Sequence, residues 1–151
     1  MGVTSPTLFS TGERVYLDSA VFIYYVENRV PYADALKPFF EAIEHERVDA
    51  YTSTVTVAEI LTVPKREKKN ALVKAFRTFL TEFVTVVPLD FEIADAAATL
   101  RADHPTLHIP DTFHLATALI TRCDRILTND QQLAALSATF GMPVSLVSQA
   151  S

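Results

Sequence analysis

The stretch that decides the fold reads IPDTFHLATAL and occupies residues 109–119. Pro110 suits the first turn of a helix, because proline lacks an N–H that this turn leaves unpaired. Leu115 and Ala118 follow Asp111 at the spacing of one helical face, so a carboxylate stands at the head of a core-facing stripe. Asp111 could cap this helix or complement its dipole, for about 0.5–2 kcal/mol, or it could be a functional acid.

The composition indicates a single soluble domain. The chain has 151 residues, 49% of them hydrophobic, which suffices for a core without disulfides or a structural metal. Cys123 is the one cysteine, so the chain can form neither an intramolecular disulfide nor a thiolate zinc cluster, as is typical of a reducing compartment. The sequence shows no signal peptide and no apolar run of about 20 residues. We therefore expect a cytoplasmic protein that does not associate with membranes.

Short apolar segments alternate with amphipathic ones, after a polar lead-in at residues 1–13. This alternation predicts a single domain over residues 14–148, an α/β fold of three-layer α/β/α sandwich type with a mostly parallel central sheet. Pro64 is expected to end one helix, and the basic run KREKK at 65–69 to open the next. We predict strands at 14–17, 48–53, 83–87, 125–128 and 142–147, and helices at 19–27, 31–46, 54–63, 65–82, 91–101, 110–119 and 131–138.

Four acids occupy equivalent places in this pattern. Asp18 and Asp130 directly follow strands, Asp111 begins a helix, and Glu59 lies about one turn into another. The ends of strands and the starts of the following helices share one edge of a parallel sheet, where ligands bind, so all four can meet there. Asp130 could instead be a helix cap, and Glu59 the acidic member of a capping box that begins at Thr56.

Converging carboxylates repel one another unless they are protonated or joined by cations. A site with oxygen donors only suits Mg²⁺ or Mn²⁺, which assist displacement at phosphate, so the pattern predicts phosphodiester hydrolysis. The net charge of −5 argues against nucleic-acid binding by bulk electrostatics, but a bound cation reverses the local field. Net charge therefore does not decide the substrate.

The acids and their neighbours resemble, in order and spacing, the four motifs of the PIN domain. The matching segments are VYLDS at 15–19, VAEIL at 57–61, IPD at 109–111 followed by Ala116 and Ala118, and LTND at 127–130. The chain length is similar to that of VapC-type toxins, the ribonuclease halves of toxin–antitoxin pairs, although the leader before the first strand is longer than usual. The resemblance implies a Mg²⁺- or Mn²⁺-dependent endoribonuclease that cleaves RNA, forms a homodimer and is silenced by a cognate antitoxin.

The resemblance also implies roles for particular residues. Asp18 and Asp111 match the principal metal ligands, Glu59 matches a third ligand that binds directly or through water, and Asp130 matches the most variable fourth acid. The two small hydroxyl positions beside the acids, which could hold a metal-bound water or a phosphate oxygen, match Ser19 and Thr128.

Other residues remain open to two interpretations. Lys65 and Arg66, in the run that ends at Lys69, could contact the RNA backbone or form a solvated helical face. His114 could carry a proton or simply be packed, and Tyr24-Tyr25 could stack on bases or pack in the core.

The same residues allow three alternatives to the toxin hypothesis. A receiver domain or an aspartate-nucleophile phosphatase normally uses a lysine late in the chain to hold the phosphoryl group, whereas the last lysine here is Lys74. Such a phosphatase would also have a second aspartate two residues after the first, whereas Asp18 is followed by Ser19-Ala20. A non-catalytic acidic protein-binding module would explain the acids as helix caps. A PIN-like nuclease of RNA processing would keep the chemistry but change the biological role.

Overall fold

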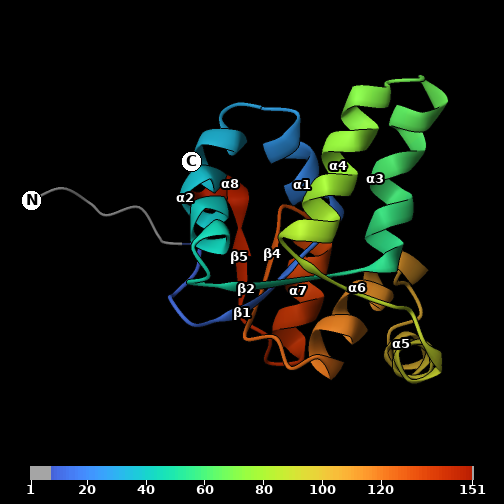
Figure 1. Cartoon of the computed structure of the whole chain (residues 1–151). Helices are drawn as coiled ribbons and strands as arrows, with labels where there is room; N and C mark the ends of the chain where they lie inside the picture. The colour runs from blue at the N-terminus through green and yellow to red at the C-terminus, as the bar shows by residue number, and fades with distance from the viewer. Residues whose placement is uncertain (1–7, 151) are drawn as a thin grey trace, which may run out of the picture.

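The computed structural model describes residues 8–150 and contains a five-stranded sheet in which all strands are parallel (Figure 1). The strands are β1 Arg14–Leu17, β2 Asp49–Ser53, β3 Thr85–Val87, β4 Arg125–Thr128 and β5 Val144–Leu146. The helices are α1 Ser19–Val26, α2 Tyr32–Glu44, α3 Thr54–Arg66, α4 Asn70–Glu82, α5 Phe91–Asp103, α6 Ile109–Ile120, α7 Gln131–Thr139 and α8 Val147–Ala150. The predicted α/β class with a central parallel sheet is confirmed.

The strand order β3-β2-β1-β4-β5 places β1 at the centre. The chain builds the sheet outward from β1 through β2 to β3, then returns to the other side of β1 with β4 and β5. Tyr16 is paired with Tyr51 of β2 and with Ile126 of β4, so β1 is bonded on both edges. Such a reversal of strand order opens a crevice beyond the carboxyl ends of the two strands, here β1 and β4.

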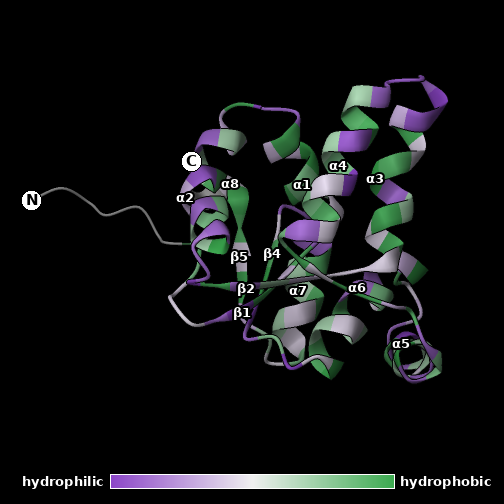
Figure 2. Cartoon of the chain, viewed as in Figure 1, coloured by the Kyte–Doolittle hydropathy of each residue, from purple (hydrophilic) through white to green (hydrophobic). Residues whose placement is uncertain are grey.

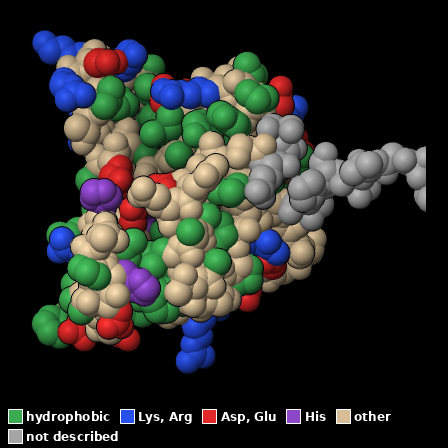
Figure 3. Space-filling view, turned by 180° about the vertical axis from the view of Figure 1, so that it is seen from behind, with side chains coloured by type: hydrophobic (Ala, Val, Ile, Leu, Met, Phe, Trp, Pro, Cys, Tyr) green, Lys and Arg blue, Asp and Glu red, His purple; other side chains and the backbone are tan. Residues whose placement is uncertain are grey.

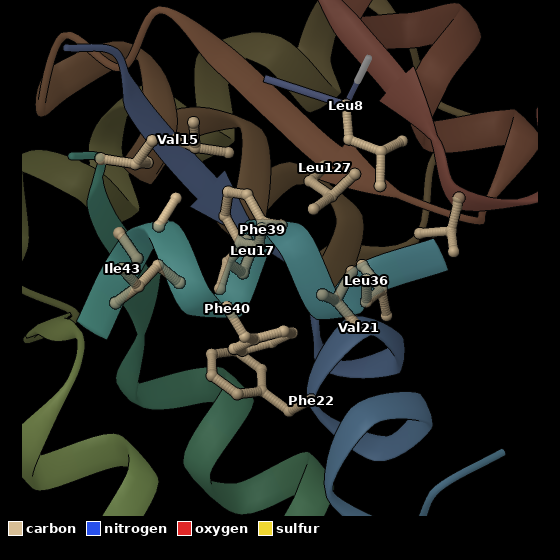
Figure 4. Close-up of a cluster of buried hydrophobic side chains, with 14 of the residues drawn as sticks. Leu8, Val15, Leu17, Val21, Phe22, Leu36, Phe39, Phe40, Ile43 and Leu127 are labelled. Atoms are coloured by element: carbon tan, nitrogen blue, oxygen red, sulfur yellow. The ribbon is translucent and has the colours of Figure 1, made fainter. Parts of the chain in front are cut away.

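Helices cover both faces of the sheet. Helices α1–α4 and α8 lie on one face and α5–α7 on the other, and the side chains of β1 alternate between them (Figure 1). Val15 and Leu17 belong to a core cluster with Phe22, Phe39 and other residues, whereas the intervening Tyr16 belongs to the opposite cluster (Figure 4). A strand that is buried on both faces explains why residues 15–17 are apolar or aromatic without polar alternation.

Helix α3 differs from its predicted boundary. It continues through Pro64 to Arg66, so Lys65 and Arg66 end this helix instead of opening the next. Pro64 removes one backbone hydrogen bond, but its carbonyl accepts the Lys69 N–H at 2.9 Å and its ring is buried. Packing near the end of the helix therefore outweighs the proline penalty, and the tip between α3 and α4 is hydrophilic (Figure 2).

The described part of the lead-in, residues 8–13, packs against the domain. Leu8 is only 6% exposed and belongs to the cluster beneath α2, while Glu13 pairs with Arg125 at 3.1 Å. The boundary at residue 14 stays a prediction. Within residues 8–150, no helix has the length and apolarity that crossing a membrane requires.

Candidate functional site

Asp18 lies between β1 and α1, at the carboxyl edge of the sheet. It is buried, and as the N-cap of α1 its Oδ1 accepts a hydrogen bond from the Ala20 N–H at 3.1 Å. Its Oδ2 accepts a hydrogen bond from the hydroxyl of Thr128, the last residue of β4. Burial raises the pKa of Asp18 to about 6, against the opposing effects of the Thr128 hydrogen bond and the His114 charge. This acid is therefore fixed where the strand order reverses, in a place where its charge is poorly hydrated.

Glu59 lies in the second turn of α3 and reaches two other helices. Its Oε1 accepts hydrogen bonds from Ser19 Oγ at 3.2 Å and from His114 Nε2 at 2.8 Å. The capping-box interpretation is wrong, because Ser53 caps α3 and accepts the Val55 N–H at 3.0 Å. Burial acts to raise the pKa of Glu59, but the hydrogen bond and charge of His114, with the Ser19 hydroxyl, hold it below its ordinary value.

Asp111 lies in the first turn of α6, half-buried, and it is not the cap of this helix. The N-cap position belongs to His108, whose side chain makes no capping hydrogen bond. Burial raises the pKa of Asp111, the nearby charge of Asp130 raises it further, and Glu59 contributes in the same direction. His114 and His108 oppose these effects. Acids from α3, α6 and the start of α7 thus share one electrostatic environment.

Asp130 is exposed and caps α7, as the alternative interpretation of this residue predicted. Its Oδ1 accepts the N–H groups of Gln132 at 2.8 Å and Leu133 at 3.2 Å. Its own N–H donates to Thr128 Oγ1 at 3.0 Å, so one hydroxyl contacts both Asp18 and the Asp130 backbone. Capping does not remove this acid from the site, because its charge still acts on Asp111 across the same edge of the sheet.

The donor set suits a hard divalent cation. All four acids offer carboxylate oxygens, which Mg²⁺ and Mn²⁺ prefer. The burial of Asp18 and the repulsion at Asp111 are electrostatic costs that a cation offsets. Within residues 8–150, no three His, Cys, Asp or Glu side chains lie close enough together to enclose an ion. The residues therefore fit the ion in their chemistry, and enclosing it requires movement of side chains.

A buried pair beside the acids is the feature that sequence patterns did not identify. His114 is 3% exposed, and its Nδ1 lies 2.6 Å from the hydroxyl of Tyr16, which is fully buried. The sequence placed His114 one turn after Asp111 but gave no sign of its contact with Glu59. Alternation along β1 does put Tyr16 on the same side as Asp18, and this was the available signal.

The other candidate residues divide between surface and core. Lys65 and Arg66 are exposed at the end of α3. The rings of Tyr24 and Tyr25 instead contact aromatic rings of α2, with centroid separations of 4.6 and 3.9 Å. The tyrosine pair therefore has a packing role. On the face seen in Figure 3, acidic and histidine side chains gather in a hollow, and lysine and arginine side chains are most numerous at one end of the molecule, with others scattered elsewhere.

Comparison with known proteins agrees with this geometry. The model of the PIN domain family matches residues 15–138. Similar solved structures include VapBC2 from Rickettsia felis bound to a promoter DNA fragment, with 14% identity, a TM-score of 0.71, and coverage of 88% of this chain and 98% of that chain. A toxin–antitoxin complex from Klebsiella pneumoniae has 22% identity, a TM-score of 0.65, and coverage of 88% and 97%.

A third similar structure is VapC20 of Mycobacterium tuberculosis, described as a Sarcin-Ricin loop cleaving toxin, with 14% identity, a TM-score of 0.63, and coverage of 80% and 93%. No curated protein matches the sequence. At such identities the structural likeness shows a shared fold, while the family match extends over most of the chain. The chain belongs to the PIN domain family.

Proposed function

We propose that this protein is a metal-dependent endoribonuclease and the toxin of a type II toxin–antitoxin pair. The observation that carries the proposal is the placement of Asp18, Glu59, Asp111 and Asp130 around the crevice between β1 and β4 of a PIN fold. An oxygen-only donor set supports Mg²⁺ or Mn²⁺ as the cofactor. When bound, such an ion neutralises charge on a phosphate that undergoes displacement.

The protein's own residues would contribute orientation and electrostatics. Asp18 and Asp111 are the proposed principal ligands, Glu59 and Asp130 the supporting ones. The Thr128 hydroxyl and the Ala20 N–H occupy both oxygens of Asp18, so its carboxylate cannot rotate freely. Asp111 and Asp130 lie nearer to solvent, where a phosphodiester can approach without entering the core. One side of the site is thus preorganised, and the other admits the substrate.

The proposed RNA contact is the basic end of α3. Arg66 follows Glu59 by seven residues, about two helical turns, so both lie on one face roughly 10 Å apart along the axis. Lys65 and Arg66 are exposed in a chain whose net charge is −5, and they can bind phosphates on either side of the scissile bond. This end is hydrophilic in Figure 2.

Protein partners are part of the proposal. Two of the similar structures described above are toxin–antitoxin complexes, which supports a cognate antitoxin for this chain. Phe91 is 87% exposed at the start of α5, and Leu89 beside it is 37% exposed. Exposed apolar side chains of this kind support a homodimer or an antitoxin contact.

The deciding experiment is cleavage of total cellular RNA by the purified, antitoxin-free protein in Mg²⁺, Mn²⁺ or EDTA, with Asp111→Asn in parallel. We expect cleavage that requires a metal and disappears in the variant. Metal-independent cleavage, or cleavage by the variant at the wild-type rate, would contradict the assignment. Folded protein that neither cleaves RNA nor binds Mn²⁺ would favour the non-catalytic binding module.

A further inference from the structure

Three side chains from three elements form a buried hydrogen-bonded chain behind the acid edge. Tyr16 of β1 contacts Nδ1 of His114 on α6 at 2.6 Å, and Nε2 of the same ring contacts Oε1 of Glu59 on α3 at 2.8 Å. The tyrosine and histidine are 0% and 3% exposed, whereas the Glu59 side chain is 36% exposed. The chain therefore runs from the core to the surface and ends at one of the proposed metal ligands.

In the Nε2–H tautomer of His114, both ring nitrogens are satisfied by their partners. Oε1 of the Glu59 carboxylate lies 2.8 Å from Nε2 and can only accept, so Nε2 is the donor. Nδ1 is then an acceptor and receives the hydrogen of the Tyr16 hydroxyl. The phenol is fully buried against this nitrogen, at 2.6 Å, and donates to it.

The carboxylate of Glu59 is held on one oxygen alone. Both of its donors, Ser19 Oγ at 3.2 Å and His114 Nε2 at 2.8 Å, bind Oε1. No residue in the described range 8–150 donates a hydrogen bond to Oε2. The two donors therefore set the plane of the carboxylate and leave its second oxygen available to a ligand.

We infer that His114 is a positioning residue, which Tyr16 and Glu59 together hold as the Nε2–H tautomer and which turns Oε2 of Glu59 toward a divalent cation. This inference rests on the proposed function, because the cation is part of it. A packing role alone does not require a histidine, since an apolar side chain fills a core position on α6 without the cost of burying polar atoms. Here both nitrogens are paired, and one of them meets an acid of the site.

Metal affinity measures positioning directly. We would titrate Mn²⁺ by calorimetry into wild type, His114→Leu and His114→Gln, with Thr117→Val as the matched control. Thr117 is buried on the same helix but hydrogen-bonds to the Phe113 carbonyl and not to an acid. We expect Mn²⁺ binding about 10–100-fold weaker in the leucine variant, close to wild type in the glutamine variant, which keeps an N–H donor, and unchanged in the control.

The tautomer can be tested without any metal. In ¹⁵N-labelled wild type, long-range ¹H–¹⁵N spectra should show His114 as the Nε2–H form, and Glu59→Gln, whose amide can donate as well as accept, should give a mixture of tautomers. An Nδ1–H form in wild type would overturn the inference whatever the variants do. If His114→Leu fails to fold, this measurement and the His114→Gln titration still test the inference.

The outcomes separate this inference from the proposed function. Wild type that binds Mn²⁺, together with a folded His114→Leu that binds it equally well, overturns the positioning role and leaves the nuclease intact. Wild type that neither binds Mn²⁺ nor cleaves RNA overturns both. Equal losses in the leucine and glutamine variants would show that the ring packs the helix and does not orient the acid.

Discussion

On the face covered by α1–α4 and α8 the core combines aliphatic side chains with several phenylalanine rings (Figure 4), whereas the core of the face covered by α5–α7 includes a buried histidine that is hydrogen-bonded to a tyrosine. The ring of Phe40 stacks on Tyr25 with a centroid separation of 3.9 Å and meets Phe79 and Phe39 edge-on at 5.0 and 5.5 Å. Such contacts stabilise a fold through area and shape, and the phenylalanine rings among them have no polar atom to orient.

The face covered by α5–α7 contains buried polar side chains. Tyr16, His114, Thr112 and Thr117 are all buried there, each with a hydrogen-bond partner. Satisfied polar groups contribute little net stability but are costly when one partner is lost, so they hold neighbouring side chains in fixed orientations. The comparison teaches that stability and site geometry are largely assigned to opposite faces of one sheet, with β1 between them.

Removing an acid of the site should give the largest effect. We expect Asp111→Asn to lower the rate of metal-dependent RNA cleavage by about 10³-fold, because several kcal/mol of charge stabilisation is lost with little change in shape. Cleavage assays in Mn²⁺ with circular dichroism would show a folded, inactive protein. Asp49→Asn, at the opposite end of the sheet, is the control and should keep wild-type activity. A folded Asp111→Asn protein with full activity would contradict the assignment of the catalytic site to the face covered by α5–α7.

The aromatic face should show the converse behaviour. We expect Phe40→Ala to lower the free energy of unfolding by about 3–5 kcal/mol, because Phe40 is fully buried and leaves a cavity. Activity per folded molecule should remain near wild type. Phe91→Ala is the control: it also removes a phenyl ring, but from a position that is 87% exposed, and should change the free energy of unfolding by less than about 0.5 kcal/mol. Urea denaturation of both variants measures the difference, and equal losses would contradict it.

Much of the fold could be predicted from local patterns. The runs at 14–17 and 125–128 are strands with those bounds, since the three residues that follow the leading arginine in each are buried and apolar, aromatic or β-branched. The end of α3 could not be predicted, because the cost of Pro64 is local whereas the burial that offsets it comes from the tertiary structure. Local propensity is reliable where packing agrees with it.

The candidate site could be predicted less completely from local sequence patterns. The expected parallel topology predicted that the four acids lie at one edge of the sheet, and their roles as metal ligands stay a prediction. The contact between Tyr16 and His114 joins residues 98 positions apart, and the sequence does not specify which of the buried side chains meet. Asp130 illustrates a further limit, because a helix cap and a site acid are not exclusive interpretations.

A pH dependence should distinguish the site from the aromatic face. Asp18 has a pKa raised to about 6 from 3.8, so its ionisation destabilises the folded state above pH 6, and this penalty disappears as the pH falls towards 4. We expect Asp18→Asn to be more stable than wild type at pH 7, by on the order of 3 kcal/mol, and the gap to close at pH 4. Chemical denaturation of both proteins at pH 7, 6, 5 and 4 measures the gap. A difference that is constant with pH would show that Asp18 is not strained by its burial.

The smallest expected effect concerns α3, the helix that carries Glu59 yet packs on the aromatic face. Replacing both Lys65 and Arg66 by serine should raise KM for RNA about 3–10-fold at low salt with kcat unchanged, since exposed cations bind phosphate without entering the chemistry. Salt screens such contacts, so the difference from wild type should shrink as ionic strength rises. The same loss of charge at Lys37 and Arg47, exposed residues in and just after α2, is the control and should leave KM unchanged. Equal KM changes in both double variants would mean that overall charge, rather than the end of α3, attracts the RNA. A fall in kcat instead would mean that the end of α3 acts on Glu59 through the helix, so that this helix belongs to the polar site as much as to the aromatic core.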